Sequence, residues 1–112
     1  MKEIKDKNLE KILEDINFSL GEFLNHQYKL ILFGSRARGE EGEFSDVDLM
    51  VILDDKMSNF ETKEKIRDII HDFSLKYPYL FSVMIVSKSL AQKRRGFLVF
   101  DSIQKEGITI NY

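Results

Sequence analysis

The chain has 112 residues, enough for one domain built around one hydrophobic core. Hydrophobic residues make up 43% of it and charged residues 32%, which is the usual mixture of a soluble globular protein. The net charge of -2 gives no overall basic field of the kind that attracts nucleic acid or an anionic membrane, and the absence of cysteine excludes disulfides and thiolate metal sites.

No segment of the sequence has the features of a membrane anchor or an export signal. The first residues, MKEIKDKNLEK, are charged where a signal peptide would be apolar. The longest apolar run, residues 49–53, is far too short to cross a bilayer. We therefore expect a soluble, cytoplasmic protein that forms a single domain over residues 1–112.

The first half of the chain predicts a helix and two strands. Apolar residues recur at helical spacing over residues 7–25 and predict an amphipathic helix. The apolar block at residues 28–33 has no helical period and predicts a buried strand. The next residues, SRARG, fit a short helix that ends at Gly39, because glycine accepts the left-handed conformation found at helix ends. A polar loop follows, and residues 47–53 predict a second buried strand.

The next segment predicts a second long helix and a third strand. Ser58 and Glu61 have the spacing of a capping box, which predicts the start of the helix. Its apolar face continues to Tyr77, and Pro78 forbids further helix. Residues 79–87 are rich in β-branched and aromatic side chains and therefore predict a strand.

The last quarter of the chain is less regular. Residues 88–95 are polar and basic, residues 97–105 carry apolar side chains at helical spacing, and Gly107 would end that last helix. The final residues, ITINY, predict a short edge strand. The order of elements indicates a small α/β or α+β domain in which helices cover a mixed sheet of three or four strands.

Two aspartates mark the beginning of the second predicted strand. Asp46 and Asp48 are two residues apart, so on a strand their carboxylates point to the same face. Like charges this close repel each other unless a cation lies between them. A hard divalent ion with oxygen ligands, Mg²⁺ first and Mn²⁺ second, suits such a pair. The apolar residues that follow would anchor the strand and hold the carboxylates in place.

A candidate phosphate site precedes the aspartates. Gly34 and Ser35 come at the end of the first predicted strand, where glycine permits a close backbone approach and unpaired amides favour an anion. Arg36 and Arg38 add cationic donors that suit phosphate oxygens. A phosphate site next to a metal site is the combination that a nucleoside triphosphate with Mg²⁺ requires.

Each part of this pattern also has an ordinary structural interpretation. A glycine-serine pair after a strand is usually a turn, and two aspartates at a strand start are often solvated or cap a helix. Two arginines alone are usually surface charge. The combination between two apolar strands is far more specific than any of its parts, so the nucleotide interpretation is favoured.

The string FGSRARGEEGEFSDVDLMV resembles the minimal nucleotidyltransferases (MNT) of the DNA polymerase β-like superfamily. Gly34 and Ser35, ten intervening residues, and then Asp46 and Asp48 match the signature of that superfamily. The order of helices and strands extends the resemblance over the whole chain, and IQKEGITIN resembles the end of many such proteins. The resemblance implies a mixed sheet with a metal site at its edge, ATP with Mg²⁺, and transfer of a nucleotidyl group to a hydroxyl.

The same resemblance implies a partner. MNT proteins are often paired with a helical HEPN protein in toxin–antitoxin modules, and some adenylylate a tyrosine of that partner. We therefore expect an ATP-using, antitoxin-like protein that moves AMP to a protein hydroxyl. The apolar residues 97–100 also leave room for homo- or hetero-oligomers, and the basic residues before them could dock a partner or form a solvated turn.

One position departs from the family. Active members carry a third carboxylate on the third strand, and alignment of LFSVMIVSK places Ser82 there. Between Asp72 and Asp101 the sequence contains no Asp or Glu. A hydroxyl is a poor base, and loss of a general base costs about 10²–10⁴-fold in rate. Ser82 could also be a small strand residue without a role, and an acid from the loop at residues 40–43 could substitute.

These observations leave the enzymatic status open between two interpretations. The first is an active Mg²⁺-dependent nucleotidyltransferase. The alternative is a catalytically degenerate nucleotidyltransferase fold that binds and neutralises a HEPN-type partner. A nucleotide-sensing subunit is a weaker third. No aromatic residues alternate with the basic ones in the way that single-strand binding requires, so the sequence gives no strong nucleic-acid signal.

Overall fold

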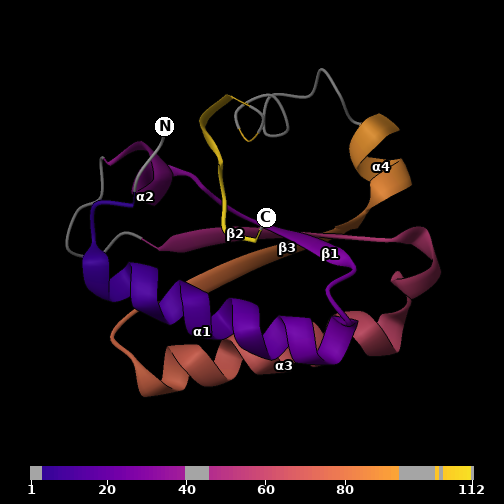
Figure 1. The fold of residues 1–112 in the computed structure, drawn as a ribbon, viewed down its shortest axis with the longest axis horizontal. Helices are drawn as coiled ribbons and strands as arrows, with labels where there is room; N and C mark the ends of the chain where they lie inside the picture. The colour runs from indigo at the N-terminus through magenta and orange to yellow at the C-terminus, as the bar shows by residue number, and fades with distance from the viewer. Residues whose placement is uncertain (1–3, 40–45, 94–102, 104, 112) are drawn as a thin grey trace.

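The computed structural model of the chain describes residues 4–39, 46–93, 103 and 105–111. Helices and strands alternate along the described chain (Figure 1). They are α1 (Lys7–Leu24), β1 (Tyr28–Phe33), α2 (Ser35–Arg38), β2 (Val47–Leu53), the 3₁₀ turn η1 (Asp55–Met57), α3 (Phe60–Lys76), β3 (Phe81–Ser87), α4 (Lys88–Lys93) and β4 (Ile108–Thr109). This order confirms the predicted mixed α/β class.

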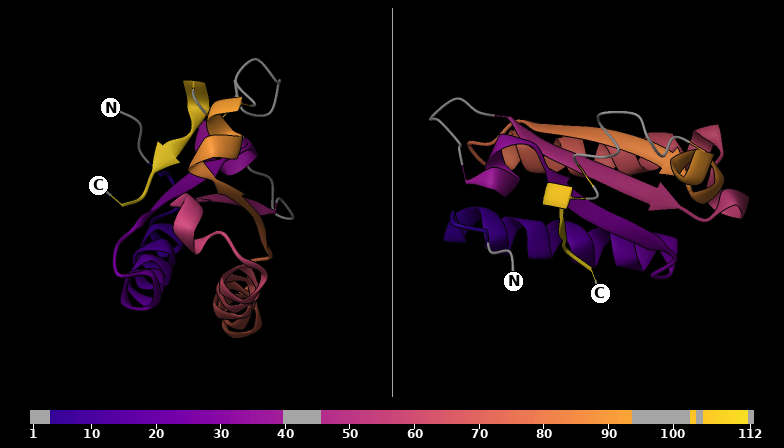
Figure 2. Two further views of the ribbon diagram at one scale, coloured as in Figure 1. Left: turned by 90° about the vertical axis from the view of Figure 1, so that its right-hand side faces the viewer. Right: turned by 90° about the horizontal axis from the view of Figure 1, so that it is seen from above.

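The four strands form one mixed sheet in the order β3-β2-β1-β4. β1 is antiparallel to both β2 and β4, whereas β2 and β3 are parallel and are connected through α3. A helical crossover of this kind is what a parallel pair needs. Figures 1 and 2 show α1 and α3 side by side on one face of the sheet, with α4 and β4 toward the other.

The alternation of side chains along β2 divides the sheet into two faces. Val47, Leu49, Val51 and Leu53 belong to the main core with the buried residues of α1 and α3. Met50 and Ile52 belong to a smaller cluster on the opposite face. Because residues two apart share a face, Asp48 lies on the same face as that smaller cluster. The two long helices, α1 and α3, thus cover one face of the sheet, and the candidate site lies on the other.

The ends of α1 and α2 follow from local chemistry. The Asp6 carboxylate accepts hydrogen bonds from the amides of Asn8 and Leu9, both at 3.1 Å, and so caps α1. Asn25 ends the helix in the left-handed conformation, with φ 51°. Gly39 ends α2 in the same conformation, with φ 73°, as predicted.

The predicted capping box at Ser58 and Glu61 is wrong. Asn59 is the capping residue, because its side-chain oxygen accepts the amide hydrogen of Thr62 at 2.9 Å. Ser58 instead ends η1, with its amide donating to the Asp55 carbonyl at 3.2 Å. The helix therefore starts one residue later than the capping box requires, and Asn is as good a cap as Ser.

Two further boundaries differ from the prediction. The third strand begins at Phe81 rather than at residue 79, and residues 88–93 form the helix α4, which the polar composition did not predict. The Ser87 hydroxyl accepts the amide hydrogen of Leu90 at 3.1 Å and so caps this helix. Most of the helix predicted over residues 97–105 lies outside the described residues. Where the chain is described again, Gly107 ends it, donating to the Ile103 carbonyl at 2.9 Å.

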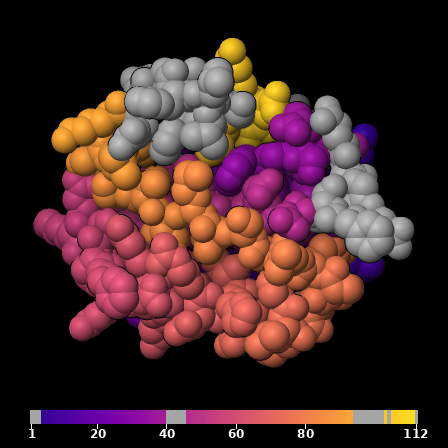
Figure 3. Space-filling model, turned by 180° about the vertical axis from the view of Figure 1, so that it is seen from behind, coloured from indigo at the N-terminus to yellow at the C-terminus, as the bar shows by residue number. Residues whose placement is uncertain are grey.

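None of the helices in the described part of the chain has the length and apolar character that a bilayer crossing requires. Seen from behind, purple and magenta atoms from the region of β1, α2 and β2 reach the surface beside the orange atoms of β3 and α3 (Figure 3). The motif residues come from this region, at the end of the sheet where β1 finishes and β2 starts.

Candidate functional site

Gly34 connects β1 to α2 in a conformation that only glycine adopts readily. Its φ of 77° lies in the region that L side chains rarely occupy. A Cβ at this position would also collide with the Oδ2 atom of Asp48. The backbone at Gly34 therefore approaches the Asp48 carboxylate more closely than any other residue would permit.

The register of the sheet brings the two halves of the motif together. β1 and β2 are paired so that Phe33, the residue before Gly34, lies across from Asp48. The residues between Arg38 and Asp46 include a stretch outside the described chain, but both ends of the motif are described. The spacing in the sequence thus corresponds to one antiparallel pairing, with the turn on one strand and the carboxylates on its neighbour.

Asp48 and Asp46 interact electrostatically. Asp48 is half-buried, and this burial raises its pKa above the ordinary value of 3.8. The negative charge of Asp46 raises the pKa further, and the positive charge of Arg38 opposes the increase. Two neighbouring carboxylates whose negative charges repel each other are the donor set that a hard divalent cation would stabilise. Asp46 itself is exposed at the start of the strand.

Ser82 lies across from Asp48 in the parallel register of β2 and β3. It is exposed on the edge strand and lines a cavity of about 480 Å³ together with Phe33, Asp48 and Arg67. No group of three or more His, Cys, Asp or Glu side chains suited to a metal ion is found within the described residues. The acids at residues 40, 41 and 43 lie outside those residues. Among the described residues, the candidate metal position therefore has two carboxylates, and the Ser82 hydroxyl lies across from one of them.

Arg67 is a residue that sequence reasoning missed. It comes from α3 and contacts Glu64, with 3.1 Å between Nη1 and Oε1. Its position at the cavity depends on how α3 packs beside β3, so the sequence carries only the signal of an ordinary ion pair three residues apart.

The two arginines of the motif have different surroundings. Arg38 is 37% exposed, forms an ion pair with Glu106 at 3.3 Å and acts electrostatically on Asp48. Arg36 is only 9% exposed. Its guanidinium contacts Asp6 at 3.4 Å and lies over the ring of Tyr79, 5.3 Å from the centroid.

We call Asp6, Arg36 and Tyr79 the Arg36 cluster. The Tyr79 hydroxyl donates to Asp6 Oδ2 at 2.6 Å. Burial, the hydrogen bond to Asp6 and the negative charge of Asp6 raise the pKa of Tyr79 to about 12. Burial raises the pKa of Asp6, but hydrogen bonds from Tyr79, Leu9 and Asn8 and the charge of Arg36 outweigh this effect and lower it overall. The cluster joins the start of α1, α2 and the segment before β3.

The structure thus brings Gly34, Asp46, Asp48, Arg38 and Ser82 to one end of the outer sheet face. Ser35 follows Gly34 as the first residue of α2 and is partly exposed. Arg36 differs from the others, because the contacts described for its guanidinium are to Asp6 and Tyr79. Such an arrangement can bind a phosphate chain near the glycine turn and a divalent cation at the carboxylates.

Comparison with known proteins identifies the family. The family model of the nucleotidyltransferase domain matches residues 7–105. Two proteins of Methanocaldococcus jannaschii, each named a putative protein adenylyltransferase, are similar over most of their length. MJ0141 is 32% identical over 102 residues, which cover 91% of this chain and 94% of the relative. MJ0604 is 27% identical over 101 residues, which cover 89% of this chain and 95% of the relative.

Two solved structures share the fold. One is a crystal structure of a putative nucleotidyltransferase from Sulfolobus solfataricus, with a TM-score of 0.59 and 14% identity, covering 91% of this chain and 78% of that one. The other is a crystal structure of a toxin–antitoxin with AMP-PNP, with a TM-score of 0.56 and 16% identity. The match covers 87% of this chain and 71% of the chain in that structure. The chain therefore belongs to the nucleotidyltransferase domain family, and within it to the minimal nucleotidyltransferases that its motif resembles.

Proposed function

We propose that this protein is a Mg²⁺-dependent nucleotidyltransferase that uses ATP and transfers AMP to a hydroxyl of a partner protein. The observation that carries the proposal is the close approach of Gly34 to Asp48, which joins a candidate phosphate turn to a pair of interacting carboxylates. The similarity to proteins named protein adenylyltransferases supports AMP as the group that is transferred. We further propose that it acts in the cytoplasm, where ATP is available.

The carboxylates would hold the metal ion. Asp46 and Asp48 offer hard oxygen donors and raise each other's energy when both are ionised, so their chemistry fits one Mg²⁺ or Mn²⁺. When bound, the ion supplies positive charge that neutralises the phosphates and aligns the reacting phosphoryl group.

The remaining motif residues hold the triphosphate. The backbone of Gly34 permits the phosphates to approach, the hydroxyl of Ser35 and the guanidinium of Arg38 donate to their oxygens, and both lie next to the carboxylates. Arg36 acts indirectly in this proposal. Its contacts with Asp6 and Tyr79 fix the helix on which Ser35 and Arg38 are carried.

The proposed transfer forms one bond and breaks one bond at the α-phosphorus of ATP. The acceptor hydroxyl oxygen forms a bond to the α-phosphorus, the bond from that phosphorus to the β-phosphate bridging oxygen breaks, and pyrophosphate leaves. The hydroxyl proton must go to a base. Because Ser82 cannot accept it efficiently at neutral pH, we expect a slow reaction unless the acceptor or a loop acid takes the proton.

A second function is favoured by the same residue. Ser82 lies across from Asp48, where a third carboxylate would contribute charge to a metal site. Its neutrality supports a degenerate nucleotidyltransferase fold that retains nucleotide binding and neutralises a HEPN-type partner by contact. The similarity in fold to a toxin–antitoxin structure is consistent with either function.

Labelled ATP separates the two functions. The protein would be incubated with Mg²⁺, with the product of the neighbouring gene as the candidate HEPN-type partner, and with ATP labelled on either the α- or the γ-phosphorus. AMP transfer predicts that the α-label alone becomes attached to the partner and that Asp46→Ala and Asp48→Ala abolish it. Tight partner binding without label would favour the degenerate function. Absence of both would contradict the two proposals together.

Ser82→Asp provides an independent test of the third position. A carboxylate restored across from Asp48 is expected to raise the rate of AMP transfer by about tenfold, a fraction of the full effect of a general base. Ser82→Asn, which is similar in size and uncharged, is the matched control. A rate that is unchanged or lower in Ser82→Asp would show that another group serves this role.

A further inference from the structure

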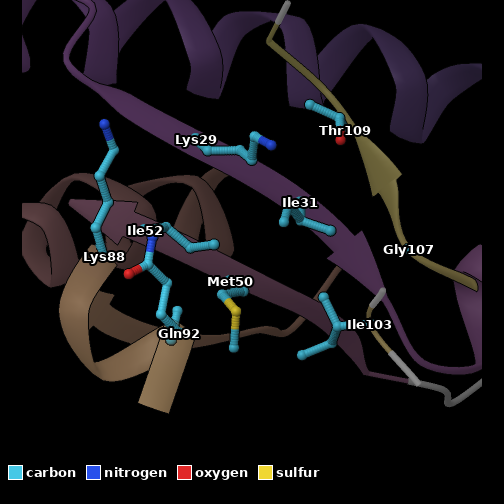
Figure 4. A pocket seen from close by; sticks show the side chains of 10 residues that line it. Lys29, Ile31, Met50, Ile52, Lys88, Gln92, Ile103, Gly107 and Thr109 are labelled. Atoms are coloured by element: carbon cyan, nitrogen blue, oxygen red, sulfur yellow. The ribbon is translucent and has the colours of Figure 1, made fainter. Parts of the chain in front are cut away.

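A larger cavity lies on the same outer face of the sheet as the candidate site. Its volume is about 630 Å³. Ile31, Met50 and Ile52 form its floor on β1 and β2, and Ile103 borders it on the side of β4 (Figure 4). Lys88, Ala91 and Gln92 border it on the side of α4. We call this cavity the β2 groove. Its floor is aliphatic, and its two long sides come from segments distant in the sequence.

The β2 groove continues the candidate site along one strand. Asp48, Met50 and Ile52 alternate along β2 and so share its outer face. Ile31 pairs with Met50 in the β1–β2 register, next to the pair of Phe33 and Asp48. At about 3.3 Å per residue, Ile52 lies about 13 Å beyond Asp48 along the strand. A ligand that follows the strand from the carboxylates would therefore enter the groove.

The far end of the groove is positively charged. Lys29 pairs with Ile52 in the register of the sheet, and Lys88 is the first residue after β3. In Figure 4 the side chains of Lys88 and Lys29 extend above Ile52, with the Lys29 amine on the side of Thr109. Asp55 is the nearby carboxylate. Hydrogen bonds from Ser89 and the positive charge of Lys88 lower the pKa of Asp55. Among the described residues that line the groove, no carboxylate is present to neutralise either amine.

We propose that the β2 groove is the docking site for the acceptor protein, which binds as an extended segment with an apolar side chain on the floor and a carboxylate at Lys29 and Lys88. The inference rests on the proposed AMP transfer, because it places the acceptor hydroxyl at Asp48. An extended peptide has the same rise per residue as β2, so the carboxylate lies about four residues from the hydroxyl.

Charge and composition favour a peptide over the other ligands. RNA would be attracted by the amines, but the described lining residues include no aromatic side chain on which a base could stack. The adenine of ATP has no negative charge that would require two amines about 13 Å from the carboxylates. An acidic, partly apolar peptide satisfies both the aliphatic floor and the basic end.

The test uses synthetic peptides and the intact protein. Each fluorescent peptide carries one tyrosine, one isoleucine and one aspartate, and the distance of the aspartate from the tyrosine is varied on both sides. Binding is measured by anisotropy, and a lysine replaces the aspartate in a control series. The proposal predicts tightest binding with the aspartate about four residues from the tyrosine. Binding that is independent of the acid and its position would overturn it.

Charge reversal locates the binding site. The double variant Lys29→Glu and Lys88→Glu should weaken binding of the aspartate peptide by about threefold to tenfold and favour the lysine peptide instead. The matched control, Lys11→Glu and Lys63→Glu, changes the net charge equally on the helices of the opposite face and should leave the preference unchanged. Equal effects of the two double variants would contradict a local site.

Two further readouts distinguish the possible failures. If the groove variant weakened binding of Mg²⁺–ATP and left peptide binding intact, the groove would belong to the nucleotide and the inference would be wrong. If the wild-type protein bound the aspartate peptide in the predicted manner but transferred no α-label to its tyrosine, the docking site would stand and the proposed transfer would fail. Peptide binding thus decides the inference without depending on catalysis.

Discussion

Arg36 and Arg38 are two residues apart in the same four-residue helix, yet they belong to different regions of the molecule. Arg36 is buried against Asp6 and Tyr79, in contacts that join three segments of the chain. Arg38 is partly exposed, next to the carboxylates of the candidate site. The comparison shows that one short motif places one guanidinium in a buried ion pair and the other beside the candidate site.

The aspartates of the two regions show the same contrast. Hydrogen bonds and the charge of Arg36 outweigh burial at Asp6 and lower its pKa, so the ionised form of Asp6 stabilises the fold. Burial and the charge of Asp46 raise the pKa of Asp48, so the ionised form of Asp48 destabilises it. The ionised form of Asp48 lowers the stability of the folded protein, and a bound cation would offset this cost. The ionised form of Asp6 is already stabilised by protein groups.

The largest expected effect is at Asp48. Asp48→Asn removes one charge of the proposed metal site and should lower the proposed AMP transfer by at least about 100-fold, as expected for loss of a charge that stabilises the transition state. Because the folded-state pKa of Asp48 is raised, its ionisation costs stability above pH 3.8, and the variant should be at least as stable as the wild type at pH 7. Rate assays and urea unfolding measure the two effects. Asp68→Asn, at an exposed position of α3, is the control.

Gly34→Ala should lower both the stability of the protein and the rate of AMP transfer. The positive φ and the collision with the Asp48 carboxylate are expected to lower the free energy of unfolding by about 2 kcal/mol. Gly39→Ala has a similar φ of 73° and would meet only the flexible Lys5 side chain, so it controls for the strain alone. Similar rates of AMP transfer in the two variants would show that the approach of Gly34 to Asp48 is unimportant.

The pair Arg36→Met and Arg38→Met tests the comparison itself. Arg36→Met removes a buried cation from Asp6 and from the Tyr79 ring, and should lower the free energy of unfolding by about 1–2 kcal/mol. Arg38→Met should change it by less than about 0.5 kcal/mol, yet weaken Mg²⁺–ATP binding by about tenfold. Denaturant unfolding and calorimetric titration distinguish these outcomes. The reverse pattern would exchange the roles of the two arginines.

The smallest effect is a pH dependence of the Arg36 cluster. Tyr79→Phe removes one hydrogen bond and should cost about 1 kcal/mol near neutral pH. Since the pKa of Tyr79 is about 12 in the folded protein and 10.0 ordinarily, the unfolded chain ionises first, and this advantage of the wild type is lost as the pH rises from 10.0 to about 12.

The acid side of the same cluster behaves in the opposite sense. The pKa of Asp6 is lowered, so its contribution is present above 3.8 and is lost as the pH falls below that value. Stability measured across the pH range should therefore show the largest difference between wild type and Tyr79→Phe on the plateau between these limits. A difference that stays constant up to pH 12 would contradict the Tyr79–Asp6 hydrogen bond.

The sequence predicted the parts of the fold that depend on local patterns. β1 and β2 were predicted with the observed limits because each is a continuous apolar block bounded by glycine or polar residues. α4 was missed because its residues are polar and its cap is a single serine. The start of α3 was misplaced by the presence of two adjacent capping residues, of which only Asn59 is used.

The candidate site was predictable to a similar extent. The motif identifies Gly34, Asp46 and Asp48, and strand alternation relates the aspartates to one face. The contacts of Arg36 with Asp6 and Tyr79 were not predictable, because these two partners are 73 residues apart in the sequence. The β2 groove was equally hidden, since Lys29 and Lys88 line the same cavity only when β1 and α4 are assembled on the same sheet.

The most direct test of the account is the Mg²⁺ dependence of ATP binding, because both candidate functions require the nucleotide site. Titration calorimetry would compare the wild type with the double variant Asp46→Asn and Asp48→Asn, and circular dichroism would establish that the variant is folded. We predict that the wild type binds ATP in the presence of Mg²⁺ and that EDTA or the double substitution removes this binding. Equal ATP binding by the folded variant and the wild type, with or without Mg²⁺, would contradict a metal–nucleotide site at these carboxylates.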